Sequence, residues 1–237
     1  MAAHVLTNCN CWLHGYDLTG DMNAMALDYG AELQDNTVFG DATRSRAGGL
    51  KTFGFNHQGY WNGGNGEVDD VLFDNLAVLS RPMTVCPENA TEGSVAYTFR
   101  PLVAQYQFGG QVGDMLAFSV SGEPQTGPLV RATIMQNGSE AATADGTARQ
   151  LGAVASGESM YGALHVFSGT GTLDVVVESD ATNSFAGAET TRITFTQASG
   201  VTSEWSSVAG AITDTWWRVT FTIATGPFNF AVVLGVK

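Results

Sequence analysis

Two segments in the first part of the chain alternate apolar and polar residues with a period of two. In Met25–Gln34 the odd-numbered positions are apolar, and in Leu50–Trp61 the rings of Phe53 and Phe55 fall on one face. Alternation of this kind predicts half-buried β-strands. We expect the two strands to pair antiparallel. The connection between them, about residues 35–49, is much longer than an ordinary hairpin loop.

One segment follows a helical period instead. From Val68 onward, apolar residues recur at the first, fourth, fifth and ninth positions. Acidic residues occupy the first turn, where the helix dipole favours negative charge. The pattern predicts one short amphipathic helix from Glu67 to about Leu79, ended by Arg81 and Pro82.

The rest of the chain is expected to form short strands separated by turns rich in glycine and small polar residues. The last of these strands is apolar on both faces, which is typical of the centre of a sheet. The segments expected as strands are 94–108, 114–123, 128–135, 161–167, 172–179, 192–197, 202–208, 216–223 and 228–236.

A change in composition divides the chain. Residues 136–150 are small, polar and turn-rich. We therefore expect a first domain over 1–138, a linker over 139–150 and a second domain over 151–237. The expected fold class is mainly β: a β-sandwich or barrel with one short helix and a long hairpin loop, followed by a second β-sandwich.

The chain is strongly acidic, with a formal net charge of -13 over 237 residues. Net attraction to DNA, RNA or an anionic membrane needs a basic surface, so the charge argues against those partners. It does not exclude a protein that DNA must pass without sticking. The N-terminus lacks the basic start and apolar core of a signal peptide, and no apolar run approaches a membrane span of about 20 residues. Sequons at Asn89 and Asn137 are interpreted as chance.

The three cysteines do not form a disulfide framework. Cys9 and Cys11 lie two apart and share a face on a strand, while Cys86 is distant. A zinc site would have to add His4 or His14, but the chain lacks both the usual ligand spacing and a second cysteine pair. We expect three reduced thiols and no metal.

No catalytic constellation is evident. Asp28 and Glu32 form a carboxylate pair, but a solvated strand face explains them better than glycosidase chemistry. Asp17, Asp21 and Asn23 have acidic spacing without the rest of a calcium loop. We expect no cofactor and no enzymatic activity.

Exposed tryptophans in the second half are candidates for sugar binding. Trp216 and Trp217 are adjacent, so on a strand they point to opposite faces. One of them is expected in the core, while the other packs against a neighbour or lies exposed. Trp205 is a third candidate. A carbohydrate-binding module therefore remains an alternative function.

The first half resembles the tail tube (major tail) proteins of long, non-contractile-tailed bacteriophages. The likeness covers about residues 5–135. It rests on the start GYDLTGD, on a loop of the form D-x-T-x-FGD-x-x-R followed by GLK, and on a late strand of the form GD-x-L-x-F-S-x-S-G-E. Residues 150–237 resemble the generic β-sandwich of phage virion proteins.

The resemblance implies a structural role in the virion tail, after assembly in the host cytoplasm. Subunits of such proteins close into rings, rings stack, and the paired strands line a channel through which DNA passes without specific binding. The implied partners are copies of the chain and other tail proteins, with no membrane. A capsid decoration or accessory protein is the alternative within virions.

The resemblance also assigns surfaces. The basic residues of the long connection and of the start of the second strand are expected at contacts between subunits, although a solvated basic loop would explain them too. These residues are Arg44, Arg46 and Lys51. Residues on the polar face of the paired strands are expected to line the channel, where carboxylates would repel phosphate. These residues are Asp28, Glu32, Thr52, Asn56 and Gln58.

Overall fold

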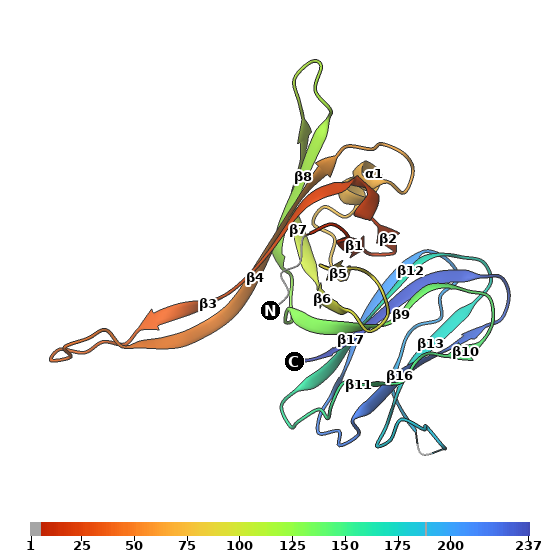
Figure 1. The fold of residues 1–237 in the computed structure, drawn as a ribbon. Coiled ribbons are helices and arrows are strands. Elements are labelled where there is room, and N and C mark those ends of the chain that lie inside the picture. The colour runs from red at the N-terminus through yellow and green to blue at the C-terminus, as the bar shows by residue number, and fades with distance from the viewer. Residues whose placement is uncertain (1–5, 188) are drawn as a thin grey trace.

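The computed structural model describes residues 6–187 and 189–237, which form three β-sheets and one α-helix (Figure 1). The elements of the first part are β1 (Asn10–Leu13), β2 (Tyr16–Asp17), a 3₁₀ turn (Thr19–Asp21), β3 (Met22–Asp35), β4 (Arg46–Tyr60), α1 (Val68–Asp74), β5 (Met83–Cys86), β6 (Val95–Phe99), β7 (Pro101–Gly109), β8 (Ala117–Pro124) and β9 (Val130–Glu140). Those that follow are β10 (Ala144–Asp145), β11 (Arg149–Gln150), β12 (Ser159–Gly169), β13 (Leu173–Asp180), β14 (Thr190–Thr194), β15 (Thr202–Ala209), β16 (Trp216–Ile223) and β17 (Phe228–Val236).

An eight-stranded sheet runs through both parts of the chain, in the order β15-β12-β17-β9-β6-β5-β1-β2. A four-stranded sheet, β3-β4-β8-β7, covers part of it, and a second sheet, β10-β16-β13-β14 with β11 beside β16, covers another part. The mainly β fold expected from the sequence is confirmed, with two sandwich layers that share one long sheet.

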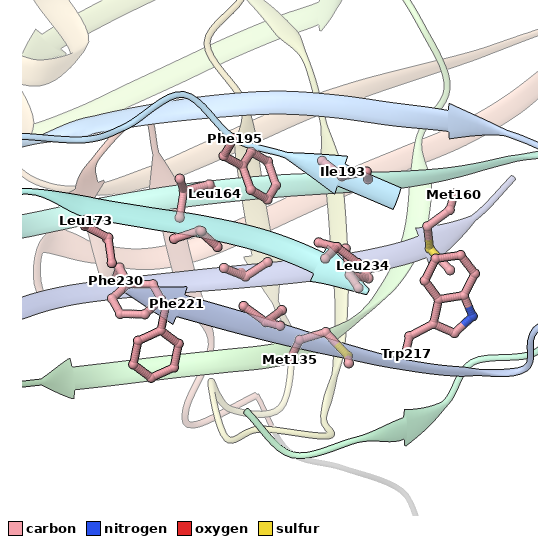
Figure 2. Close-up of a cluster of buried hydrophobic side chains, with 14 of the residues drawn as sticks. Met135, Met160, Leu164, Leu173, Ile193, Phe195, Trp217, Phe221, Phe230 and Leu234 are labelled. Carbon is pink, nitrogen blue, oxygen red and sulfur yellow. The ribbon is translucent and has the colours of Figure 1, made fainter. Parts of the chain in front are cut away.

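The second sandwich has a core of aliphatic and aromatic side chains (Figure 2). Phe230 and Leu234 of β17 pack against Phe221 and Trp217 of β16, all nearly inaccessible to solvent. The rings of Phe221 and Phe230 meet edge to face at 5.2 Å between centroids. This cluster holds the second sheet on the eight-stranded sheet.

The first sandwich buries one face of the four-stranded sheet. Phe53 and Phe55 of β4 contact the ring of Phe99 on β6, at centroid distances of 4.9 and 6.0 Å. Helix α1 closes the side of this core with its buried Val71 and Leu72. In β4 the apolar positions Phe53 and Phe55 therefore fill the core, whereas the half-buried strand predicted for Met25–Gln34 is wrong beyond Leu27, since Tyr29 and Leu33 are 46% and 63% exposed.

The eight-stranded sheet curls so that β1 meets β12. Trp12 packs on the ring of Phe167 at 5.5 Å, inside a third buried cluster. The buried His165 bonds Thr84 through Nε2 at 2.8 Å and the backbone carbonyl of His14 through Nδ1. The ring of His14 in turn lies 2.7 Å from the Ser203 hydroxyl, which ties the N-terminal segment to β15.

Several sequence predictions are confirmed. Strands β3 and β4 pair antiparallel, with Leu27 opposite Phe55. Strand β17, apolar on both faces, lies between β12 and β9 inside the sheet. The connection between β3 and β4 is shorter than predicted, because the strands continue to Asp35 and restart at Arg46.

The predicted lengths of two elements were wrong. The helix ends at Asp74 and not near Leu79, and the chain after it takes positive φ angles of 58° at Ala77 and 63° at Ser80, which a helix cannot contain. The segment 94–108 is two strands, β6 and β7, divided at Arg100 and assigned to different sheets. A local alternation pattern carries no information about which sheet a strand joins.

The predicted division of the chain stays a prediction. Strand β9 pairs with β6 on one side and with β17 on the other. The predicted linker, residues 139–150, contains β10 and β11, and both pair with β16. Within the described residues, no helix has the length and apolar character needed to cross a lipid bilayer.

Candidate assembly surfaces

The four-stranded sheet has one apolar and one polar face. Its polar face carries amides, hydroxyls and carboxylates in register across the strands: Asn56 lies opposite Ser121, and Ser121 lies opposite Gln105. Lys51, the neighbour of Thr52, pairs with Ala31 and so falls on the other side of the sheet. The polar residues of this face are Asp28, Thr52, Asn56, Gln58, Gln105, Gln107, Ser119, Ser121 and Glu123.

The structure brings together four of the five predicted channel-lining residues. Asp28, Thr52, Asn56 and Gln58 are exposed on this face. Glu32 lies further out, at a bulge of the β3–β4 pair. That the face lines a channel stays a prediction, and the structure provides the exposed polar side chains that the prediction requires.

Sequence reasoning missed the other half of the polar face. Ser119, Ser121 and Glu123 showed the alternating pattern, as did Gln105 and Gln107. Their pairing with β4 could not be read from that pattern, because β8 lies far from β4 in the sequence and strand pairing is non-local. The sequence therefore indicated that these positions are polar, but it did not indicate that their strands lie beside β4.

The distal part of β3 and β4 forms an arm that projects from the body (Figure 1). We define the arm as residues 30–51, all of which are exposed. Its loop is held by its own hydrogen bonds, from the Asn36 amide to the Ser45 carbonyl at 3.1 Å and from the Val38 amide to Asp41 Oδ2 at 3.1 Å. The arm therefore has a defined shape while packing on nothing else in the described chain.

The arm exposes both basic and apolar groups. Of the three predicted contact residues only Arg44 lies in the loop, while Arg46 and Lys51 lie on β4 opposite Asp35 and Ala31. The placement of Arg46 in the loop was wrong, because β4 begins earlier than the alternation suggested, whereas Lys51 lies on the second strand as its predicted start at Leu50 requires. Large apolar side chains of the arm are also exposed: Leu33, Val38, Phe39 and Leu50, with Phe39 fully so.

Both edges of the four-stranded sheet are largely open. In the described part of the chain, β3 makes only a local backbone hydrogen bond outside its ladder with β4, from the Met22 amide to the Thr19 carbonyl, and β7 receives only one at its outer edge, from the Ala77 amide to the Val103 carbonyl at 3.0 Å. Open edges present unpaired amides and carbonyls that can accept a further strand. The sheet can therefore be extended at both ends by neighbours.

The described residues considered as zinc ligands contact other kinds of side chain. His14 faces Arg81 and Ser203, and the Cys9 thiol lies 3.3 Å from the Met25 sulfur. His4 lies outside the described residues. Among those described, no group of three or more His, Cys, Asp or Glu side chains is placed to hold a metal ion.

The tryptophans of the second half divide as expected for neighbouring strand positions. Trp217 is buried, and its indole N–H donates to the Gly152 carbonyl at 2.9 Å. Trp216 is half-buried on the outer face, opposite Asp180. Trp205 is half-buried beside Tyr161, with the Arg100 guanidinium 5.8 Å from its ring centroid.

No protein-family model matches the sequence, and no curated protein matches it. Fifteen chains of solved structures match this chain, and three of them illustrate the likeness. A chain of the virion of a native gene transfer agent particle is 14% identical with a TM-score of 0.43, over 54% of this chain and 98% of that one. A chain of the tail of an empty gene transfer agent particle is 14% identical with a TM-score of 0.37, over 50% and 92%.

The third structure is the SPP1 Dit (gp 19.1) protein, described as a paradigm of the hub adsorption apparatus in phages that infect Gram-positive bacteria. It is 10% identical with a TM-score of 0.38, over 98% of this chain and 100% of that one. At these identities and TM-scores we base the functional assignment on the surfaces of the chain itself.

Proposed function

We propose that this protein is a structural subunit of a phage tail, and specifically a tail tube subunit whose copies close into stacked rings around a DNA channel. The proposal rests mainly on the four-stranded sheet: it buries one face, presents a face free of lysine and arginine, and leaves its two edges open in the described residues. The sequence resemblance to tail tube proteins supports the same role.

Ring closure follows from the two open edges. If β7 of one copy lies beside β3 of the next, the sheet continues from subunit to subunit. Such a contact joins two different surfaces, and a repeated contact of this kind closes into a ring when the rotation between copies allows it. The polar faces then form one continuous wall.

The wall suits the passage of DNA. Its charges are the carboxylates of Asp28 and Glu123, its other polar groups are amides and hydroxyls, and Ala24, Ala26 and Leu102 lie among them. Tight DNA binding requires cationic contacts with phosphate, which release counterions. A wall without them keeps DNA hydrated and mobile.

The arm supplies contacts beyond the sheet. A two-stranded ribbon with exposed apolar groups is marginally stable alone, and a neighbour that covers it would stabilise both. Arg44 and Arg46 would meet carboxylates of an acidic neighbouring copy through charge-assisted hydrogen bonds.

Negative-stain microscopy of the purified chain tests the function. We expect rings and stacked tubes. Closed rings that never stack would favour a place at the end of a tail, while decoration of capsids would favour the accessory role. A monomer that binds glycans and forms no ring at any concentration would contradict the proposal.

The arm contact has its own test. The double variant Arg44→Glu with Arg46→Glu should lose tubes or form them only within a narrower range of salt concentration. Arg44→Lys with Arg46→Lys keeps the charge and serves as the control. Tubes of unchanged salt tolerance in the glutamate variant would show that the loop is merely solvated.

A further inference from the structure

Helix α1 and the turn after it expose an apolar surface on the side away from the core. Phe73, Leu76 and Leu79 are 70%, 44% and 59% exposed, and we call them the helix knob. The opposite side of the helix is buried through Val71 and Leu72. Three neighbouring large apolar side chains in water mark a contact site more often than a bare surface.

The knob lies beside β7, on the core side of the four-stranded sheet. The Ala77 amide bonds the Val103 carbonyl at the outer edge of β7, and the Tyr106 hydroxyl donates to Asp69 at 2.7 Å. Burial and that carboxylate raise the pKa of Tyr106 well above its usual range, so the hydroxyl keeps its proton and can donate to Asp69. The knob is thus fixed at the β7 end of the sheet.

An apolar hollow opens at the other end of the same sheet. It has a volume of about 440 Å³ and lies where β3 faces the eight-stranded sheet. We call it the edge hollow; it is lined by Met25, Leu27, Tyr29, Val85, Pro87, Tyr97 and Leu129. Like the knob, it is on the core side of the sheet.

Three basic residues lie beside the edge hollow, and the exposed Glu88 follows its lining residue Pro87. The Lys237 ammonium lies 5.1 Å from the ring centroid of Tyr29. Lys51 pairs with Ala31, the next position on the same face of β3, and Arg131 pairs with Tyr97. No ion pair joins these three groups to an acid in the described chain. The helix, by contrast, is acidic, with Glu67, Asp69, Asp70 and Asp74 within or next to it.

We propose that the helix knob of one copy seats in the edge hollow of the next copy around the ring. The inference rests on the proposed ring, in which β7 of one subunit lies beside β3 of its neighbour. That pairing carries the knob to the hollow, since both lie on the core side at the two joined edges. The acidic helix then faces the basic rim, which fixes the direction of assembly.

Matched variants test the contact. The knob variant is Phe73→Asp with Leu76→Asp, and the hollow variant is Tyr29→Asp with Lys237→Glu. Val201→Asp changes a side chain of similar exposure, 43%, away from both surfaces and is the control. Circular dichroism and thermal melting of each variant should match the wild type, because every substituted side chain is substantially exposed or terminal.

Each double variant should raise the protein concentration needed for half-maximal ring formation by at least about tenfold, as expected for buried contact residues. The control should form rings like the wild type. A mixture of the two variants gives the sharpest readout. Each partner keeps one good surface, so the mixture should form heterodimers that grow no further, measured by light scattering or native mass spectrometry.

Rings of wild-type affinity in the knob variant, or a mixture that stays monomeric while both variants are folded, would overturn the contact. If the wild type itself forms no rings, the proposed function fails and not only the contact. The two failures are therefore distinguishable.

Discussion

At the scale of single residues, we consider His57, a buried side chain that affects how stability depends on pH. It lies on the buried face of β4, and neither ring nitrogen has a hydrogen-bond partner among the described residues. Burial lowers the pKa of His57 to about 4, from an ordinary value near 6.5. The folded protein therefore holds this imidazole neutral where the unfolded chain binds a proton.

The sign of the pH effect follows from this difference. Between about pH 6.5 and pH 4 the unfolded state binds more protons than the folded state, so the free energy of unfolding decreases as pH falls through that window. Below about pH 4 both states bind the proton, and His57 causes no further loss. Burial also lowers the pKa values of His14 and His165 to about 4, so they act in the same direction.

We predict that His57→Leu reduces the loss of stability between pH 7 and pH 5. At pH 7 it should be neutral or stabilising by about 1–3 kcal/mol, since it removes two unpaired buried polar atoms. Urea unfolding at both pH values measures this. An unchanged pH dependence would show that His14 and His165 dominate, and a large destabilisation at pH 7 would show that His57 has an essential partner.

At the scale of elements, β3 and β4 show which features the local sequence pattern predicts and which depend on strand pairing. The period of two placed Phe53 and Phe55 toward the core and Asp28 away from it, and the structure confirms these faces. The same pattern placed the start of the second strand four residues too late, at Leu50 where β4 begins at Arg46. The early glycines of β4 weaken the pattern, although pairing with β3 holds them extended.

We predict that the arm is dispensable for folding. Replacing Ala31–Lys51 by Asn-Gly would join the paired residues Gly30 and Thr52 through a two-residue turn. The melting temperature should change by less than about 4 °C, because the removed residues are exposed. Ring stacking or closure should be lost. Normal tubes from the shortened chain would show that the arm is not an assembly element.

At the scale of the whole molecule, the structure shows where some of the chain's negative charge lies. The chain carries a formal net charge of -13, and the polar face contributes carboxylates and no base. In a ring this sign is repeated around the wall, and a repeated field repels phosphate more than a single carboxylate does. An acidic composition would therefore suit the proposed DNA channel, where a basic protein would bind the DNA.

We predict that Asp28→Lys with Glu123→Lys converts the wall into one that retains DNA. Assembled tubes of this variant should bind DNA, and the binding should weaken steeply with salt because each lysine contacts phosphate. Glu158→Lys with Asp174→Lys gives the same net charge away from the wall and should leave binding unchanged. Equal DNA retention by both variants would mean that net charge alone decides, and that the polar face is not the wall.

The sequence by itself determined the mainly β class, the faces of β3 and β4, the existence of α1 and the central position of β17. Each follows from side-chain periodicity, which is local, because a strand or helix turns its side chains at a fixed interval whatever its neighbours are. The polar character of Ser119 and Ser121 was readable in the same way.

Only the tertiary structure decided which of these faces meet. It joined β8 and β7 to β4 in one polar wall, divided 94–108 between two sheets, and linked β9 to β17 across the chain. It also placed the helix knob and the edge hollow at opposite ends of one sheet. Such neighbours are chosen by the burial of many side chains at once, and that choice depends on the whole chain and not on any segment of it.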